Sequence, residues 1–141
     1  MASNDSMAQR CADEGAVRDL IHRLAMYADG LGTCEEYAQL FTEDGEWLMP
    51  NAPRKGRSAI LAGSIERRSE GGVGPGSNTR HIVASTVMEF DGPDKAIADS
   101  YWMFFADTAT SPRIMMMGYY RDTLVRTSTG WKMARREIAF G

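Results

Sequence analysis

The chain has 141 residues, a formal net charge of −3 and 43% hydrophobic residues, values typical of one globular domain rather than of a disordered chain. The mildly acidic balance argues against nucleic acid as a partner, and no apolar run approaches the roughly 20 residues that cross a membrane. The polar N-terminus lacks the apolar stretch of a signal peptide, and the two cysteines, Cys11 and Cys34, lie in no metal-binding pattern. We therefore expect a cytoplasmic protein without a metal ion.

A polar segment opens the chain and gives way to a helical pattern. Residues 1–11 are predicted to form a flexible tail, and residues 12–141 a single domain. Apolar residues recur at helical spacing from Val17 onward and predict a helix over about Asp13–Ala28, which Gly30 ends.

Two further helices and a short strand follow. Thr33 and Glu36 have the spacing of a capping box and predict a short second helix. Residues Glu46–Met49 are predicted to form a short strand, and Arg57–Ser69 a third helix. The glycine-rich segment 71–78 matches no phosphate-binding motif and is expected to be a loop, either a lid or an inert insertion.

The second half of the chain alternates between apolar and polar residues, the pattern of β-strands. Four long strands, joined by turn sequences, are predicted over residues 79–90, 96–106, 113–126 and 131–140. Helices followed by antiparallel strands favour an α+β fold with the helices packed on one face of a curved sheet. Such an arrangement leaves a concave pocket between the layers, a natural place for a ligand.

The order and spacing of several segments resemble the SnoaL-like branch of the NTF2-like superfamily. The segments are VRDLIHRLAMYADG, YAQLFTEDGEW, KGRSAI, TRHIVAS, FDGPDKAIADSYW, GYYRDTLVR and GWKMARREI. The resemblance implies a cone-shaped barrel in which three N-terminal helices pack on a strongly curved, mainly antiparallel sheet. The superfamily includes scytalone dehydratase, a bile-acid dehydratase, a lindane dehydrochlorinase, isomerases, polyketide cyclases and non-catalytic carriers, so the fold alone does not fix the function.

The same resemblance implies a catalytic pair formed by Asp29 and His81. Cofactorless dehydratases of the superfamily share an aspartate at the end of the first helix and a histidine on the first long strand, and these two residues hold the matching positions. A neutral imidazole can accept a proton near cell pH, and a carboxylate on its other nitrogen fixes the tautomer. The alternative is structural, with Asp29 solvated at a helix end and His81 bonded to a backbone carbonyl.

Further residues are predicted to bind substrate. Ten methionines and several aromatic residues predict a bulky, apolar substrate, and Tyr27, Tyr101 or Arg136 would stabilise developing charge. Alternation puts His81, Val83, Ser85 and Val87 on one face of the first long strand. Both faces of the next strand are apolar, so alternation does not decide which face of that strand points inward. The predicted substrate-binding residues are Tyr27, Trp47, Tyr101, Met115, Met117, Tyr119 and Arg136.

Together these features predict a cofactor-independent lyase or dehydratase acting on an apolar cyclic or aromatic small molecule. His81 would remove a proton, Asp29 would hold His81, and elimination would follow. An isomerase or a polyketide-cyclase-type enzyme using the same base is one alternative, and a non-catalytic ligand-binding or assembly subunit is another. We expect no cofactor, no nucleic-acid or membrane partner, and self-association as a homodimer or homotrimer through the outer face of the sheet.

Overall fold

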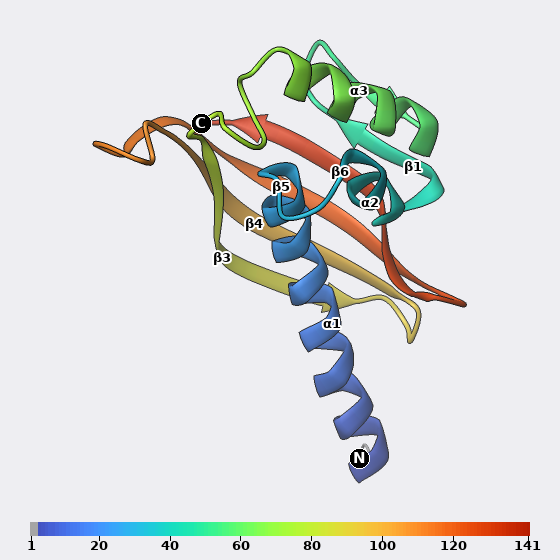
Figure 1. The fold of residues 1–141 in the computed structure, drawn as a ribbon. Helices are drawn as coiled ribbons and strands as arrows, with labels where there is room; N and C mark the ends of the chain where they lie inside the picture. The colour runs from blue at the N-terminus through green and yellow to red at the C-terminus, as the bar shows by residue number, and fades with distance from the viewer. Residues whose placement is uncertain (1–2) are drawn as a thin grey trace.

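The computed structural model describes residues 3–141. Two helices, α1 (Asn4–Ala28) and α2 (Cys34–Gln39), open the chain. The strands β1 (Phe41–Leu48) and β2 (Arg54–Lys55) separate them from α3 (Arg57–Ser69), and a run of long strands completes the fold (Figure 1). These strands are β3 (Arg80–Phe90), β4 (Lys95–Ala106), β5 (Arg113–Thr127) and β6 (Gly130–Phe140).

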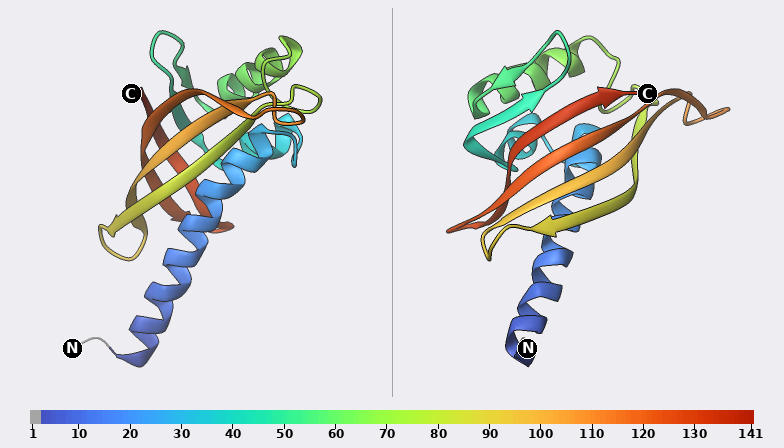
Figure 2. Two further views of the ribbon diagram at one scale, coloured as in Figure 1. Left: turned by 90° about the vertical axis from the view of Figure 1, so that its left-hand side faces the viewer. Right: turned by 180° about the vertical axis from the view of Figure 1, so that it is seen from behind.

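The six strands form one curled sheet with the order β2-β1-β6-β5-β4-β3. Neighbouring strands are antiparallel except β1 and β6, which run parallel because α3 and the long strands intervene between them. The sheet does not close, since β2 and β3 are its two edges. The three helices cover one face of the sheet and leave the other uncovered (Figure 2). The predicted α+β class, with three helices on a curved and mainly antiparallel sheet, is confirmed.

The core lies between α1 and the inner face of the sheet. The α1 residues at helical spacing are buried, as the sequence predicted. In β4 the inward residues have even numbers, and among them Trp102 and Phe104 are the largest. Residues buried in this core include Val17, Ile21, Leu24, Phe41, Ile60, Leu124 and Met133.

Helix α1 begins at Asn4 rather than near Asp13, so the predicted start of this helix is wrong and residues 4–11, assigned to a tail in the sequence analysis, are helical. Residues 1–2 lie outside the described part of the chain. The Ser3 side chain caps the helix by accepting a hydrogen bond from the Ser6 backbone N–H at 3.1 Å. The first turns extend beyond the sheet and bury no apolar stripe, so hydrophobic periodicity gives no signal there (Figure 1).

A β-bulge at Ser85 reverses the alternation of β3. The pairing with β4 shifts between Ala84 and Thr86, and Ser85 has a φ of 56°. His81 and Val83 are half-buried, whereas Ser85 and Val87 are exposed. The prediction that all four share one face is therefore wrong, because one extra residue turns the following side chains over.

Candidate active site

A cavity of about 280 Å³ lies between the helices and the inner face of the sheet. Its wall is mostly apolar, with Leu24 and Ala28 from α1 and aromatic rings from α2 and the strands. The aromatic residues lining it are Tyr37, Trp47, Trp102, Phe104, Tyr120 and Phe140. An apolar cavity with a few polar groups is the usual form of a small-molecule site.

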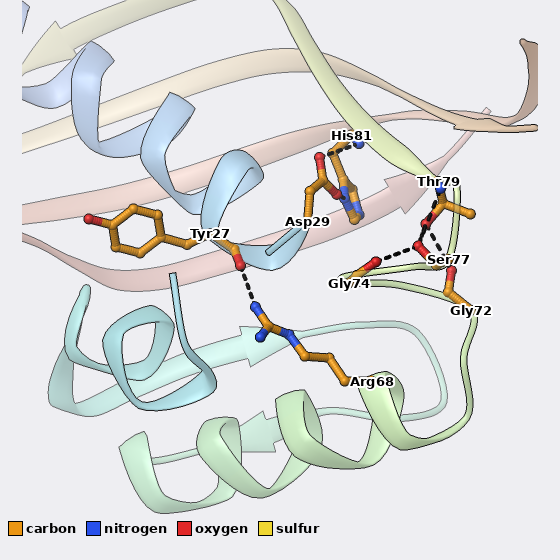
Figure 3. A network of polar contacts seen from close by, with 8 residues as sticks. All are labelled: Tyr27, Asp29, Arg68, Gly72, Gly74, Ser77, Thr79 and His81. Carbon is orange, nitrogen blue, oxygen red and sulfur yellow. Dashed lines mark hydrogen bonds and ion pairs between the residues drawn. The ribbon is translucent and has the colours of Figure 1, made fainter. Parts of the chain in front are cut away.

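Asp29 and His81 are joined by two hydrogen bonds at the edge of this cavity (Figure 3). The Asp29 Oδ1 atom lies 2.7 Å from His81 Nδ1, and Asp29 Oδ2 accepts the His81 backbone N–H at 2.9 Å. Asp29 occupies the C-cap of α1, where Gly30 adopts a φ of 116° and the helix ends. His81 is the second residue of β3, so both positions follow from where these elements begin and end.

The two bonds fix the orientation and the tautomer of His81. A carboxylate only accepts hydrogen bonds, so Nδ1 carries the proton, and in the neutral imidazole Nε2 then keeps its lone pair. No residue between 3 and 141 forms a hydrogen bond with Nε2. The imidazole lines the cavity and lies against Phe104, with 4.7 Å between ring centroids. This arrangement can accept a proton from a molecule in the cavity.

Arg68 fixes the end of α1 beside Asp29. Its Nη2 atom donates a hydrogen bond to the Tyr27 carbonyl at 2.6 Å (Figure 3). The same atom donates to the Gly32 carbonyl at 2.7 Å. These carbonyls flank the turn that carries Asp29, and a cation is favourable at the C-terminus of a helix. Arg68 therefore holds α3 against the turn that presents the carboxylate.

The loop at 71–78 is held by its own hydrogen bonds next to the cavity. Thr79 Oγ1 donates to the Gly72 carbonyl at 3.1 Å, and Ser77 Oγ donates to the Gly74 carbonyl at 2.7 Å (Figure 3). Gly72 and Val73 line the cavity. The loop thus forms part of the cavity wall, and its role as a lid stays a prediction.

Two predicted substrate-binding residues, Trp47 and Arg136, line the cavity. Arg136 is buried and donates to both carboxylate oxygens of Asp122 at 2.9 Å, while its guanidinium lies 3.7 Å from the centroid of the Tyr120 ring. Burial alone would lower the pKa of Arg136, but the Asp122 carboxylate outweighs it and raises that pKa. Its charge is already neutralised, so Arg136 has less to offer a substrate anion than the sequence suggested.

Five other predicted substrate-binding residues do not line the cavity, so the structure does not bring them to this site. The Tyr27 hydroxyl accepts a hydrogen bond from Arg23 on the surface of α1. The other four side chains are about half exposed or more on the outer face of β4 and β5, namely Tyr101, Met115, Met117 and Tyr119. Both faces of these strands are apolar, and the face carrying Trp102, Phe104 and Tyr120 is the one that packs against the helices.

The sequence reasoning missed Tyr37 and Tyr120 as cavity residues. Both are buried, and burial raises the pKa of the Tyr37 phenol and raises that of Tyr120 to about 12. Both phenols therefore stay protonated at neutral pH and can donate hydrogen bonds. For Tyr120 the alternation of β5 was the available signal, since Tyr120 shares its face with Leu124. Tyr37 lies on α2, where it is one of the buried residues of that helix.

Residues 3–141 hold no group of three or more His, Cys, Asp or Glu side chains that could bind a metal ion. Within the same range no helix is both long and apolar enough to span a membrane.

Comparison with solved structures places this architecture among the NTF2-like proteins with a cystatin-like fold. One such protein from Novosphingobium aromaticivorans is 28% identical with a TM-score of 0.81, covering 99% of this chain and 91% of its own. A second protein from that organism, named "Putative Scytalone Dehydratase", is 22% identical with a TM-score of 0.74, covering 96% and 88%. A Catenulispora acidiphila protein, solved in complex with S-DNPA, is 25% identical with a TM-score of 0.76, covering 92% and 94%.

The chain belongs to the SnoaL-like family, because the model of the SnoaL-like domain matches residues 9–137. This family includes polyketide cyclases and dehydratases, and its members are often enzymes. No curated protein matches the sequence. The S-DNPA complex shows that a structural neighbour takes up a small molecule.

Proposed function

We propose that the protein is a cofactor-independent lyase of the dehydratase type, acting on an apolar cyclic or aromatic small molecule. The observation that carries the proposal is the 2.7 Å contact between Asp29 Oδ1 and His81 Nδ1 at the wall of an apolar cavity. This contact orients a base, and the cavity supplies a place for a hydrophobic substrate. The cytoplasmic location stays a prediction that rests on composition.

In the proposed reaction His81 Nε2 removes a proton from a carbon next to a carbonyl. The electrons of the C–H bond move into an enolate, and the hydroxyl on the neighbouring carbon leaves as the double bond forms. The imidazolium gives its proton to this leaving group, so water departs and His81 returns to its neutral form. Asp29 stabilises the imidazolium throughout.

Tyr37 and Tyr120 are the proposed donors to the developing oxyanion. Their phenols line the cavity and stay protonated, since burial raises both pKa values. A donor aimed at the position where charge develops lowers the barrier more than one that binds only the ground state. In this proposal the two tyrosines take the role that the sequence suggested for Tyr27 or Tyr101.

The first half of the reaction can be tested without knowing the leaving group. We expect the protein to catalyse exchange of the α-protons of 1-tetralone, a bicyclic ketone, for deuterium, followed by NMR. The His81→Asn variant should lose about a hundredfold or more of this rate, because a positioned base supplies about 10²–10⁴-fold. The fold should be unchanged by circular dichroism.

His22→Asn is the matched control, because His22 is the second histidine of the chain and is exposed on α1. This variant should exchange at the wild-type rate. Equal rates in wild type and His81→Asn, or no exchange above the uncatalysed rate with any of a panel of cyclic ketones, would contradict the proposal and favour a ligand carrier. An isomerase would also exchange, and its product would be a shifted double bond without loss of water.

A further inference from the structure

Arg67 is a charged residue in the cavity wall with no protein partner for its charge. It lies near the C-terminus of α3 and is half-buried. Its guanidinium lies 4.2 Å from the centroid of the Trp47 ring. No hydrogen bond or ion pair joins Arg67 to any residue between 3 and 141, whereas Arg136 in the same wall binds both oxygens of Asp122.

The residues around Arg67 do not pair with its charge, because the attraction of Glu66 is weaker than the repulsion of Arg54. The side chains of Arg54 and Arg67 both lie over Gly63, where an added Cβ atom would be 3.0 Å from Arg54 Nε and from Arg67 Nη1. Arg54 therefore brings a second positive charge close to Arg67. Glu66 is already engaged by Arg54 at 2.6 Å. Glu70 also lines the cavity, but it is exposed and forms no ion pair in the described chain.

Such an arrangement is unusual for a cation. Withdrawal from solvent lowers the pKa of Arg67, which means that its surroundings disfavour the charge. Charges held in protein interiors are normally paired. The contact with the Trp47 ring does not use the hydrogen-bonding capacity of the guanidinium, and no protein group in the described chain accepts a hydrogen bond from its N–H groups. A planar oxyanion fits these N–H groups, since it accepts two parallel hydrogen bonds.

We propose that the ligand of this cavity carries a carboxylate, or another planar oxyanion, that pairs with Arg67 while its apolar body contacts Trp102, Phe104 and Tyr120. The anionic group binds at the α3 side of the cavity, and the rest of the molecule extends towards His81. This inference rests on the proposed function only in assigning the ligand as a substrate, and the anion preference holds equally for a carrier.

The experiment compares two probes of nearly the same shape, 2-naphthoate and neutral 2-naphthamide, by isothermal titration calorimetry. Wild type should bind the carboxylate about tenfold or more tightly than the amide, because charge-assisted bonds are about twice as strong as neutral ones. Arg67→Gln should bring the two dissociation constants within about threefold of each other, and Arg67→Lys should keep part of the preference. The amide should bind Arg67→Gln about as well as wild type.

Arg18→Gln is the matched control, because Arg18 is exposed on α1 and its replacement removes the same charge outside the cavity. It should keep the preference for the carboxylate. The His81→Asn variant should keep it as well, so failure of this inference and failure of the proposed catalysis are read separately. Equal binding of both probes to wild type, no binding of either probe, or an unchanged preference in Arg67→Gln would overturn the inference. An equal loss of affinity for both probes in Arg67→Gln would also overturn the inference, because Arg67 would then serve only to pack against Trp47.

Discussion

At the scale of single residues, Asp29 does two things with its two oxygens. One accepts a hydrogen bond from the backbone N–H of His81, and the other accepts a hydrogen bond from the imidazole Nδ1–H. The first bond fixes where β3 begins relative to α1, and the second fixes the tautomer. A residue that keeps the first bond but reverses the direction of the second separates the structural role of Asp29 from its chemical role.

Asn at position 29 provides that separation. In Asp29→Asn the amide oxygen can still accept the His81 backbone N–H, which turns the NH₂ group towards Nδ1. Nδ1 must then accept, so the proton moves to Nε2 and blocks the base. We expect a loss of about 10²–10⁴-fold in the deuterium-exchange rate with a melting temperature close to that of wild type. A rate near wild type would show that the tautomer is not controlled by Asp29.

At the scale of elements, α1 is attached to the sheet and to α3 at two points along its length. Asp29 and Arg68 hold its C-terminal end, and Asp13 holds its middle. Asp13 is buried and accepts hydrogen bonds from Arg126 at 2.6 Å, from Gln9 at 3.0 Å and from Trp131 at 3.2 Å. The bonds from Arg126 and Trp131 join the middle of the helix to β5 and β6.

The Asp13 attachment gives the protein a predicted sensitivity to acid. Burial alone would raise the pKa of Asp13, but the hydrogen bonds from Arg126, Gln9 and Trp131 outweigh it and lower that pKa. A lowered folded-state pKa stabilises the fold above the unfolded value of about 3.9, and this contribution is lost as the pH falls through the folded value.

We expect Asp13→Asn to cost about 1 kcal/mol at pH 7, since solvent screens the partly exposed Arg126 partner. This corresponds to a fall in melting temperature of about 2–4 °C. The difference in melting temperature between variant and wild type should shrink as the pH falls below about 3.9. A gap of the same size at pH 7 and pH 3 would contradict the assigned role of the carboxylate.

At the scale of the whole molecule, the sheet has two apolar faces and the helices cover one of them. Large hydrophobic side chains remain exposed along the outer face of β3, β4 and β5, where Val87 is 68% and Tyr101 is 65% accessible. Met117 and Tyr119 continue this surface. A contiguous exposed apolar patch is typical of an interface, which supports the prediction that the chain associates with copies of itself.

Light scattering tests this prediction directly. We expect a mass of two or three 15.6 kDa chains for the wild type, and a shift towards one chain for Met117→Arg, because a buried unpaired charge disfavours the interface. Met117 does not line the cavity, so proton exchange should be retained. A monomeric wild type at micromolar concentration would contradict the prediction.

Local patterns were enough to predict the class of fold and the order of its helices and long strands. The capping box at Thr33 and Glu36 is present, and the helix over Arg57–Ser69 has the predicted bounds. Each of these signals depends on residues a few positions apart, whose interactions form within one element. The start of α1 was missed because its exposed first turns carry no apolar pattern.

The sequence by itself determined that a helix ends at Asp29 and that a strand begins near His81, and resemblance to a family paired the two. Only the tertiary structure decided that their side chains meet, because they lie 52 positions apart and depend on how α1 packs against β3. It also decided which face of β4 and β5 lines the cavity, since alternation is uninformative where both faces are apolar. The bulge at Ser85 and the unpaired charge of Arg67 likewise arise from contacts between elements, which no single segment encodes.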